Sequence, residues 1–379
     1  MHSSRSVGTV VDLFSGCGGF SLGAELAGFR SLAAVDVEPV LQSGYRRNFP
    51  HTRAIEADVS DLDLHDWRML LDGKRPDGLI GGPPCQGFSS IGKRELRDPR
   101  NTLISQFYRH VALLRPKFFL MENVEGILHE QNRPLLDAAL ETLPSHYVVV
   151  GPISVNAGDY GAATRRRRVV VFGYDPAEFP FTTEEDFRPL TLSTATVRDA
   201  IADLPKPISQ SKDSANFGWA QYPETTSSLH PYAAAARQAP PPDLGSAEGR
   251  ERHKHGFVSG LFETVHSDAI HTRYLGVAGG RSDPITKSYK LEWDGQCPTL
   301  RAGTGSERGA FQAVRPLHPD EGRVISVREA ARLQGFPDWF EFHPTKWQSF
   351  RMIGNSVSPY VSLGLMKPIA RKLQVDKAA

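Results

Sequence analysis

Hydrophobic residues in the first half of the chain alternate between short β-branched runs and longer stretches with helical spacing. The runs at 7–14, 31–37, 54–59, 77–81, 117–121, 146–155 and 168–174 predict strands. Helical spacing is found at 20–28 and at 101–114, where Leu103, Phe107, Val111 and Leu114 share one stripe. Strands separated by helices are typical of a mostly parallel sheet with helices on both faces. We therefore expect an α/β fold.

The pattern changes at about residue 180. From there to about residue 324 the periodicity is weak, and Pro, Gly, Ser, Thr and His are common. A disordered linker is one interpretation, but the aromatic residues of this stretch indicate a small core: Trp219, Phe257, Phe262, Tyr274, Tyr289 and Trp293. Helical patterns return at 327–334 and 358–373. We expect one domain formed by 1–188 and 350–379, and a smaller loop-rich domain with a hinge at 189–349.

The charge balance and the cysteines exclude several classes of protein. The 379 residues include 44 Lys and Arg against 43 Asp and Glu, so the chain cannot coat nucleic acid through net charge alone, although a local basic face remains open. Cys17, Cys85 and Cys297 are far apart, which opposes a disulfide scaffold and a cysteine-ligated metal site. We expect no metal. Neither a signal-peptide pattern nor a membrane-spanning run is present, so we expect a cytoplasmic protein.

A glycine-rich turn, DLFSGCGGF at 12–20, joins the first predicted strand to the first helix. Glycine lets a ligand approach the backbone, and a helix N-terminus presents free N–H groups. Ser21 occupies the third position of the dinucleotide fingerprint, which weakens a nicotinamide or flavin interpretation. Asp36 lies about 20 residues after Gly16, where a carboxylate can bind two ribose hydroxyls. An adenosine cofactor fits, and a tight turn with an unrelated surface acid is the alternative.

Two further motifs end neighbouring predicted strands. GGPPCQGFS at 81–89 presents Cys85 at the carboxyl end of a strand, where open α/β sheets bind ligands. A lone cysteine is usually a small buried hydrophobic residue, but the flanking glycines and prolines favour a functional thiol. Glu122, in ENV, can supply a proton or a hydrogen bond to a substrate nitrogen, or can simply cap a helix or form an ion pair. We expect Cys85 and Glu122 to face one pocket.

Four consecutive arginines at 165–168 open the last predicted strand. Arg166 and Arg168 share a face because side chains alternate along a strand. Guanidinium groups at the active edge of the sheet suit phosphate and base oxygens, whereas the simpler interpretation is a solvated run of charge.

In order and spacing, these motifs resemble those of the cytosine-C5 DNA methyltransferases of bacterial restriction–modification systems. DLFSGCGGFSLG is similar to the cofactor loop of that family, GGPPCQGFS to its nucleophile loop and ENV to its glutamate motif. YGAATRRRRVVVFG at 160–173 resembles its arginine strand, and the segments at 327–340 and 353–365 resemble its last two motifs. The sequence departs from the family at Thr164, where the family usually has Gln.

The resemblance implies a Rossmann-like, S-adenosylmethionine-dependent methyltransferase that acts on C5 of a flipped-out cytosine and releases S-adenosylhomocysteine. It implies catalytic roles for Cys85, Glu122, Arg166 and Arg168. The implied cofactor-binding residues are Phe14, Gly16, Gly18, Gly19, Phe20, Asp36, Val37, Asp58, Val59, Pro83, Leu103, Asn355 and Val357. The implied DNA-binding residues are Ser89, Ser90, Lys93, Arg94, Arg97 and Arg301, with 189–349 as the target-recognition domain.

The partners implied are double-stranded DNA and a paired restriction endonuclease, and we expect a monomer that works at the nucleoid. A tRNA cytosine-C5 methyltransferase is an alternative, but the long inserted segment and the QGFS ending of the nucleophile loop favour DNA. A nicotinamide oxidoreductase does not explain Cys85 with Glu122. A catalytically inactive DNA-binding relative is disfavoured because the nucleophile, the glutamate and the arginines are all present.

Overall fold

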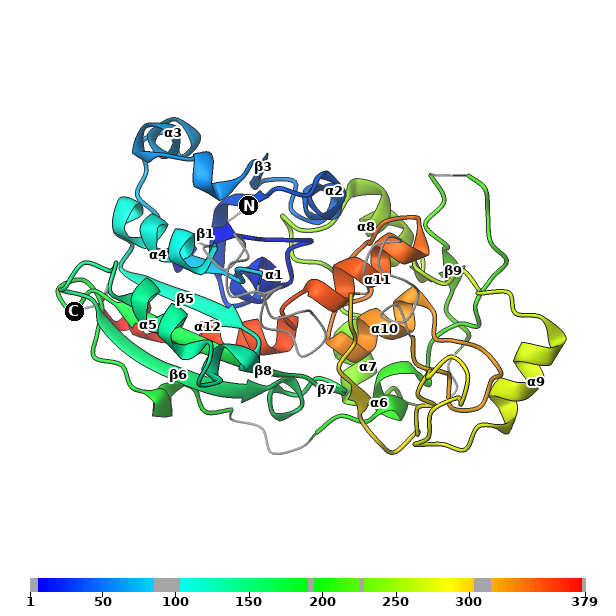
Figure 1. Ribbon diagram of the computed structural model, residues 1–379. Helices are drawn as coiled ribbons and strands as arrows, with labels where there is room; N and C mark the ends of the chain where they lie inside the picture. The colour runs from blue at the N-terminus through cyan, green and yellow to red at the C-terminus, as the bar shows by residue number, and fades with distance from the viewer. Residues whose placement is uncertain are drawn as a thin grey trace.

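The computed structural model describes residues 6–84, 103–189, 194–213, 215–224, 228–302 and 315–376. Its centre is a seven-stranded sheet with the order β3-β2-β1-β4-β5-β8-β6 (Figure 1). The first five strands in that order are parallel, whereas β8 runs antiparallel to both β5 and β6. The predicted mostly parallel sheet is confirmed. The strands are β1 Gly8–Leu13, β2 Phe29–Asp36, β3 Arg53–Glu56, β4 Gly78–Gly81, β5 Phe118–Asn123, β6 Val148–Asn156 and β8 Arg167–Tyr174.

Helices cover both faces of this sheet. Side chains of α1 (Gly19–Leu26) and α12 (Pro359–Asp376) pack on one face, and those of α3 (Leu64–Leu70), α4 (Leu103–Leu114) and α5 (Arg133–Leu140) pack on the other. The central strand β5 serves both layers, because Phe118 and Leu120 join the first cluster while Phe119 and Met121 join the second. A run of four apolar residues is therefore buried completely.

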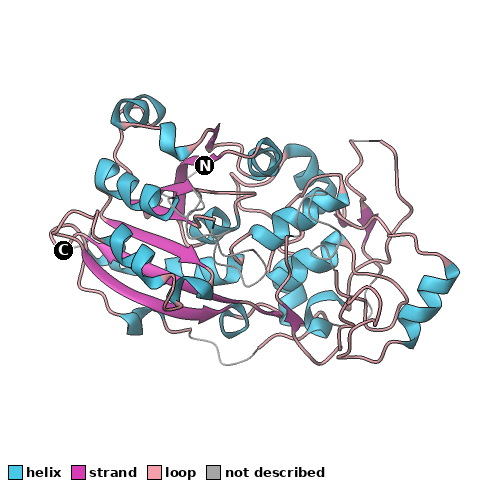
Figure 2. Cartoon of the chain, viewed as in Figure 1, coloured by secondary structure: helices cyan, strands magenta, loops and turns pink. Residues whose placement is uncertain are grey.

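The rest of the chain consists mainly of loops and short helices (Figure 2). The helices are α2 Pro39–Asn48, α6 Val197–Ile201, α7 Pro231–Ala236, α8 Ala247–Lys254, α9 Asp268–Gly276, α10 Val327–Gln334 and α11 Lys346–Asn355. Short strands pair β7 Thr164–Arg165 with β11 Cys297–Pro298, and β9 Ala220–Gln221 with β10 Phe257–Val258. None of the helices in the described ranges is long and apolar enough to cross a bilayer.

Two parts of the loop-rich segment that are far apart in sequence, 197–198 and 293–295, lie side by side. The backbone N–H groups of Val197 and Arg198 donate hydrogen bonds to the carbonyls of Gly295 and Trp293, at 2.9 and 2.8 Å. The chain between residues 199 and 292 therefore leaves and returns at one place. The apolar core on which it packs is shared, because Leu333 and Phe336 cluster with Tyr45 and Phe49 from the first half of the chain.

The structure corrects several sequence predictions. The strand predicted at 54–59 ends at Glu56, because the Asp58 side chain accepts a hydrogen bond from the Ser60 N–H and caps a short 3₁₀ turn, η1 Val59–Asp61. The arginine run does not form one strand, since β7 ends at Arg165 and β8 starts at Arg167. The sequence analysis also missed α2, α3, α5 and α11, and the short helices of the loop-rich segment.

A buried histidine connects the helical layer to η1, the short turn that follows β3. The Trp67 Nε1–H of α3 donates to His110 Nδ1 at 2.9 Å, so the ring proton lies on Nε2, which donates to the Val59 carbonyl at 2.8 Å. His110 is completely buried, and burial lowers its pKa to about 4. The neutral ring is the form that makes both hydrogen bonds.

This histidine should make the protein less stable in mild acid. Between pH 6.5 and 4 the unfolded chain binds a proton at His110 that the folded chain excludes, so the free energy of unfolding falls as the pH falls through this window. The loss by pH 5 should be about 2 kcal/mol, since one pKa unit corresponds to about 1.4 kcal/mol. Urea unfolding at pH 7 and pH 5 should show a smaller loss in His110→Gln. The matched control is His65→Gln, on the exposed side of α3, which should keep the wild-type difference. Equal losses in wild type and His110→Gln would exclude His110 as the responsible group.

Candidate active site

The turn between β1 and α1 presents bare backbone at the carboxyl edge of the sheet. Phe14 adopts a φ of 58°, which is uncommon for a residue with a side chain and is typical of functional sites. Gly16 has a φ of 55°, and no described atom lies within 4 Å of the place that a Cβ would take. Gly18 follows with a φ of 97° and lies directly before α1. A ligand can therefore approach this turn closely.

Asp36, at the end of β2, is tied to the same turn. Its Oδ2 accepts the Gly16 N–H at 2.8 Å, and its Oδ1 accepts the Glu38 N–H at 2.9 Å. Burial raises the pKa of this carboxyl, and the two backbone hydrogen bonds oppose that rise. A carboxylate has about four acceptor positions, so two remain for hydroxyl groups of a ligand. Beside Asp36, Val37 exposes 62% of its surface although it is apolar, and Asp58 and Val59 follow from the adjacent strand β3.

The end of the chain packs against the beginning of α1. A Cβ at Gly19 would lie 1.9 Å from Ser356 Oγ and 2.3 Å from the Val357 carbonyl oxygen. Ser362 Oγ donates to the Phe20 carbonyl at 2.6 Å. The structure therefore brings Val357, and Asn355 at the exposed end of α11, to the turn that carries Gly16 and Gly18. Of the other expected cofactor residues, Leu103 begins α4 and packs against the apolar core on the same face as Val59.

Glu122 forms an ion pair with Arg168 at the carboxyl edge. β4 and β5 are adjacent and parallel, as predicted, and Glu122 is 8% exposed. Arg168 Nε lies 2.9 Å from Glu122 Oε1, but Oε1 accepts no hydrogen bond from the described residues, because the N–H is not aligned with it. A Cβ at Gly82 would lie 3.3 Å from Glu122 Oε2. The carboxyl group thus keeps acceptor capacity beside the loop that follows β4.

Asn123 holds the start of that loop. Its Nδ2 donates to the Pro83 carbonyl at 3.2 Å, and its Oδ1 accepts the Val124 N–H at 2.8 Å. Pro83 is buried beside it. The loop continues into residues outside the described ranges, which include Cys85 and the expected DNA-binding residues Ser89, Ser90, Lys93, Arg94 and Arg97.

Arg166 lies between β7 and β8 whereas Arg168 lies within β8, and the two side chains have different partners. Arg166 is 3% exposed and donates to three carbonyl oxygens, those of Leu300, Gly354 and Ser356, at 3.0 to 3.2 Å. Burial and then the charge of Arg168 lower its pKa, while Glu122 opposes the change. Arg301, the residue after Leu300, is exposed. Arg166 therefore links the arginine strand to the turn at 299–301 and to the end of the chain.

Thr164 explains how the arginine strand is held where the sequence departs from the family pattern. Its Oγ1 donates to the Cys297 carbonyl at 3.0 Å, within the β7–β11 pair. Thr299 Oγ1 in turn donates to the Arg165 carbonyl at 2.8 Å. Two hydroxyl groups thus bind the arginine strand to the segment that ends the loop-rich region.

Both cysteines in the described residues are unsuited to act as nucleophiles. Cys17 and Cys297 are free and buried. Burial raises the pKa of the Cys17 thiol to about 12 and that of Cys297 still higher, so both remain protonated at neutral pH. The described residues also contain no group of three His, Cys, Asp or Glu side chains placed to hold a metal ion.

Sequence analysis missed three contributors to this region. Asn123 lies inside the recognised ENV motif but was given no role of its own. Arg351 pairs with Glu38 at 3.0 Å. Burial raises the pKa of the nearby Asp36, and the charge of Arg351 opposes that rise. Arg351 and Glu38 are over 300 positions apart, so no local pattern connects them. His110 looks like one more residue on an amphipathic helix, and only its two hydrogen bonds reveal its contact with Val59.

Comparisons with known proteins agree with this arrangement. The family model for C-5 cytosine-specific DNA methylase matches residues 8–371. The type II methyltransferase M.XorII of Xanthomonas oryzae is 38% identical, and the match covers 98% of this chain and 86% of that protein. The type II methyltransferase M.DdeI of Desulfomicrobium norvegicum is 29% identical, and the match covers 95% of this chain and 88% of that protein. A solved structure assigned as a DNA modification methyltransferase of an E. coli prophage has 38% identity and a TM-score of 0.86, covering 97% of this chain and 99% of that one. The chain belongs to the C-5 cytosine-specific DNA methylases, and it is a DNA cytosine methyltransferase of the restriction–modification type.

Proposed function

We propose that the enzyme acts on a cytosine rotated out of duplex DNA and forms a transient covalent bond between the Cys85 sulfur and C6 of the base. The pair formed by Glu122 and Arg168 carries this proposal, because it lies at the end of β5, beside the start of the loop that leads to Cys85. The other two thiols are buried and protonated, which leaves Cys85 as the nucleophile. Rotation of the base is required because C5 and C6 are inaccessible within the stack.

In this mechanism the Cys85 thiolate adds to C6, and Glu122 stabilises the resulting charge by giving a proton or hydrogen bond to N3. Arg168 holds Glu122 in place and donates to O2. The electron pair then resides at C5, which can accept an electrophile. When bound, S-adenosylmethionine supplies the methyl group. Loss of the C5 proton to a base and cleavage of the C6–S bond restore the aromatic ring and release the thiolate, so that one difficult step is divided into easier ones.

The residues around Gly16 fit that cofactor. The space above Gly16 can admit a ligand, Asp36 keeps two acceptor positions for ribose hydroxyls, and the exposed Val37 offers an apolar surface to the adenine. We assign four more residues to the same site. Val357 packs against the start of α1 and Asn355 ends α11 two residues earlier, while Asp58 and Val59 follow β3, which pairs with β2. After transfer, S-adenosylhomocysteine would leave from it.

We further propose that residues 189–349 select the DNA sequence. Arg301 and the loop that follows Cys85 would contact the DNA. The enzyme would act as a cytoplasmic monomer that is paired with a restriction endonuclease. Support comes from the loop-rich segment, which lies outside the sheet, and from the relatives, which are type II methyltransferases. A tRNA substrate is the weaker candidate, because the family model and these relatives name DNA methylation or type II modification.

Cys85→Ala should abolish methyl transfer, because neither remaining thiol can form a thiolate at neutral pH. The matched controls are Cys17→Ala and Cys297→Ala, which should keep the wild-type rate per folded molecule. Transfer of labelled methyl groups to DNA measures all three. Turnover by the purified Cys85 variant above trace level would refute the assignment.

DNA containing 5-fluorocytosine should trap the wild-type enzyme as a covalent band on a denaturing gel, since fluorine cannot leave C5 as the proton does.

Glu122→Gln should lower the single-turnover rate by roughly 10²- to 10⁴-fold, the usual contribution of general acid catalysis. Gln has nearly the same shape, so the melting temperature and DNA affinity should change little. Glu125→Gln is the matched control, because Glu125 pairs with Arg167 at 2.9 Å in a more exposed position. A stable Glu122→Gln enzyme with a rate within about threefold of wild type would remove Glu122 from catalysis.

Asp36→Ala should weaken S-adenosylmethionine binding by roughly ten- to a hundredfold, because charge-assisted hydrogen bonds contribute about 1.5–3 kcal/mol. Isothermal titration calorimetry measures the dissociation constant. Glu56→Ala is a suitable control, since Glu56 lies opposite Asp36 on β3 and pairs outward with Arg46. An unchanged constant in Asp36→Ala would place the ribose elsewhere.

A further inference from the structure

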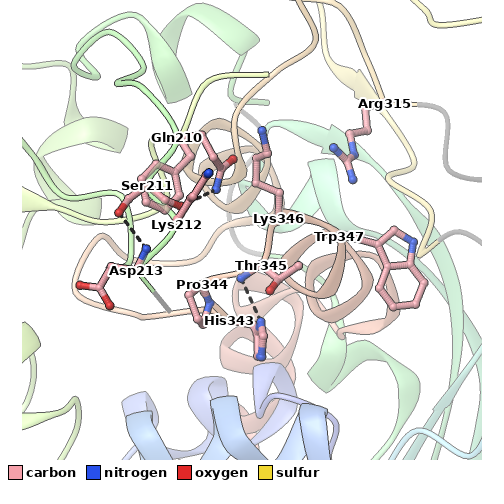
Figure 3. A pocket seen from close by; sticks show the side chains of 11 residues that line it. Gln210, Ser211, Lys212, Asp213, Arg315, His343, Pro344, Thr345, Lys346 and Trp347 are labelled. Carbon is pink, nitrogen blue, oxygen red and sulfur yellow. Dashed lines mark hydrogen bonds between the residues drawn. The ribbon is translucent and has the colours of Figure 1, made fainter. Parts of the chain in front are cut away.

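A hollow of about 620 Å³ lies at the N-terminus of α11, far along the chain from the catalytic motifs (Figure 3). We call it the α11 pocket. Its lining comes from the loop at 210–213, from Phe262, from Arg315 and from residues 343–347. The opposite end of α11 is Asn355, so one helix of ten residues separates this pocket from the expected cofactor site.

Three cations, Lys212, Arg315 and Lys346, line the α11 pocket. Figure 3 shows Lys346 between Lys212 and Arg315. No ion pair joins any of the three to a carboxylate among the described residues. Burial and then the charge of Arg315 lower the pKa of Lys346, while the charge of Glu263 opposes the change, and burial lowers the pKa of Arg315. Like charges repel, so two neighbouring cations in a partly buried hollow favour the binding of an anionic ligand.

Other contacts hold Lys346 and Arg315 in place. Lys346 Nζ donates to the Glu263 carbonyl at 2.5 Å and to Thr264 Oγ1 at 3.3 Å, which fixes its position, and Arg315 lies 4.0 Å from the ring centre of Phe350. The single carboxylate of the lining, Asp213, is exposed and accepts the Ala215 N–H at 2.9 Å. Its hydrogen bond lies within its own loop and not with the cations.

The start of α11 adds uncompensated N–H groups. Thr345 precedes the helix, and its side chain makes no capping hydrogen bond. Instead the Thr345 N–H donates to His343 Nδ1 at 3.0 Å, and burial lowers the His343 pKa, so this ring is neutral. A helix N-terminus with free N–H groups attracts anions. It therefore reinforces the preference that the three cations establish.

We propose that the α11 pocket binds a backbone phosphate of the DNA substrate, at a distance from the flipped cytosine. Arg315 and Lys346 would donate to the non-bridging oxygens from inside the pocket, and the exposed Lys212 would do so from its rim. DNA is the source we favour because it is the polyanion on which this family acts, and because phosphate contacts fix the position of a protein on the duplex. The inference rests on DNA methyltransferase activity and not on the covalent mechanism.

The test is the salt dependence of binding to a duplex of arbitrary sequence, measured by fluorescence anisotropy. Each lost phosphate contact should reduce the slope of log K against log salt by about 0.9. Arg315→Gln and Lys212→Gln should show this reduction and bind roughly three- to tenfold more weakly at about 0.1 M salt, while the affinity for S-adenosylmethionine stays unchanged. Arg315→Lys, which keeps the charge, should restore most of the slope.

Lys74→Gln is the matched control, because Lys74 is exposed in the loop before β4, at the opposite edge of the sheet from the catalytic motifs. It should keep the wild-type slope. Slopes that are unchanged in both pocket variants would overturn the proposal.

A second arm compares inorganic phosphate with chloride of equal ionic strength. If phosphate raises the melting temperature of wild type but not of Arg315→Gln, while the DNA slopes stay equal, the pocket binds a free anion and the DNA assignment is wrong.

Discussion

The close approach of the chain's end to the first helix is the constraint on which the site depends. Gly19 and Gly23 lack side chains where Ser356, Val357 and Ser362 pack against α1, and a Cβ at either glycine would lie within 2.4 Å of these residues. This contact is possible only with glycine, because any larger residue would separate α1 from α12. The same approach brings the carbonyls of Gly354 and Ser356 to Arg166, so the arginine strand and the cofactor turn are positioned together.

Arg166 and Arg168, two positions apart in the sequence, have different partners. Arg166 donates hydrogen bonds to three backbone carbonyls, whereas Arg168 pairs with Glu122. A buried guanidinium with carbonyl partners is rigid, and it exerts its charge without leaving its place. Arg166 is therefore held in place by backbone carbonyls, whereas Arg168 lies beside the Glu122 carboxyl group.

Local sequence patterns predicted what depends on local physics. The strands of the sheet, the glycine turn and the position of Asp36 beside Gly16 follow from short-range spacing, and the structure confirms them. Contacts such as Arg351 with Glu38 and Arg166 with Leu300 join residues far apart in sequence, so periodicity could not reveal them. Helices α2 and α11 were missed because their polar residues interrupt the apolar stripe, and tertiary packing stabilises them.

The two hydrogen bonds that join Val197 and Arg198 to the 293–295 turn have a consequence for evolution. The chain between residues 199 and 292 starts and ends at neighbouring points, much as a domain inserted into a loop does. It also packs on the rest of the enzyme, because the Gly245 N–H donates to the Asn48 carbonyl at 2.8 Å and Tyr232 stacks on Tyr360 of α12. Insertions, deletions or wholesale replacement within that stretch need not disturb the register of any strand in the main sheet. A change of length or sequence in this stretch can therefore leave the Glu122–Arg168 pair at the edge of the sheet in place, provided that the contacts with α2 and α12 are kept.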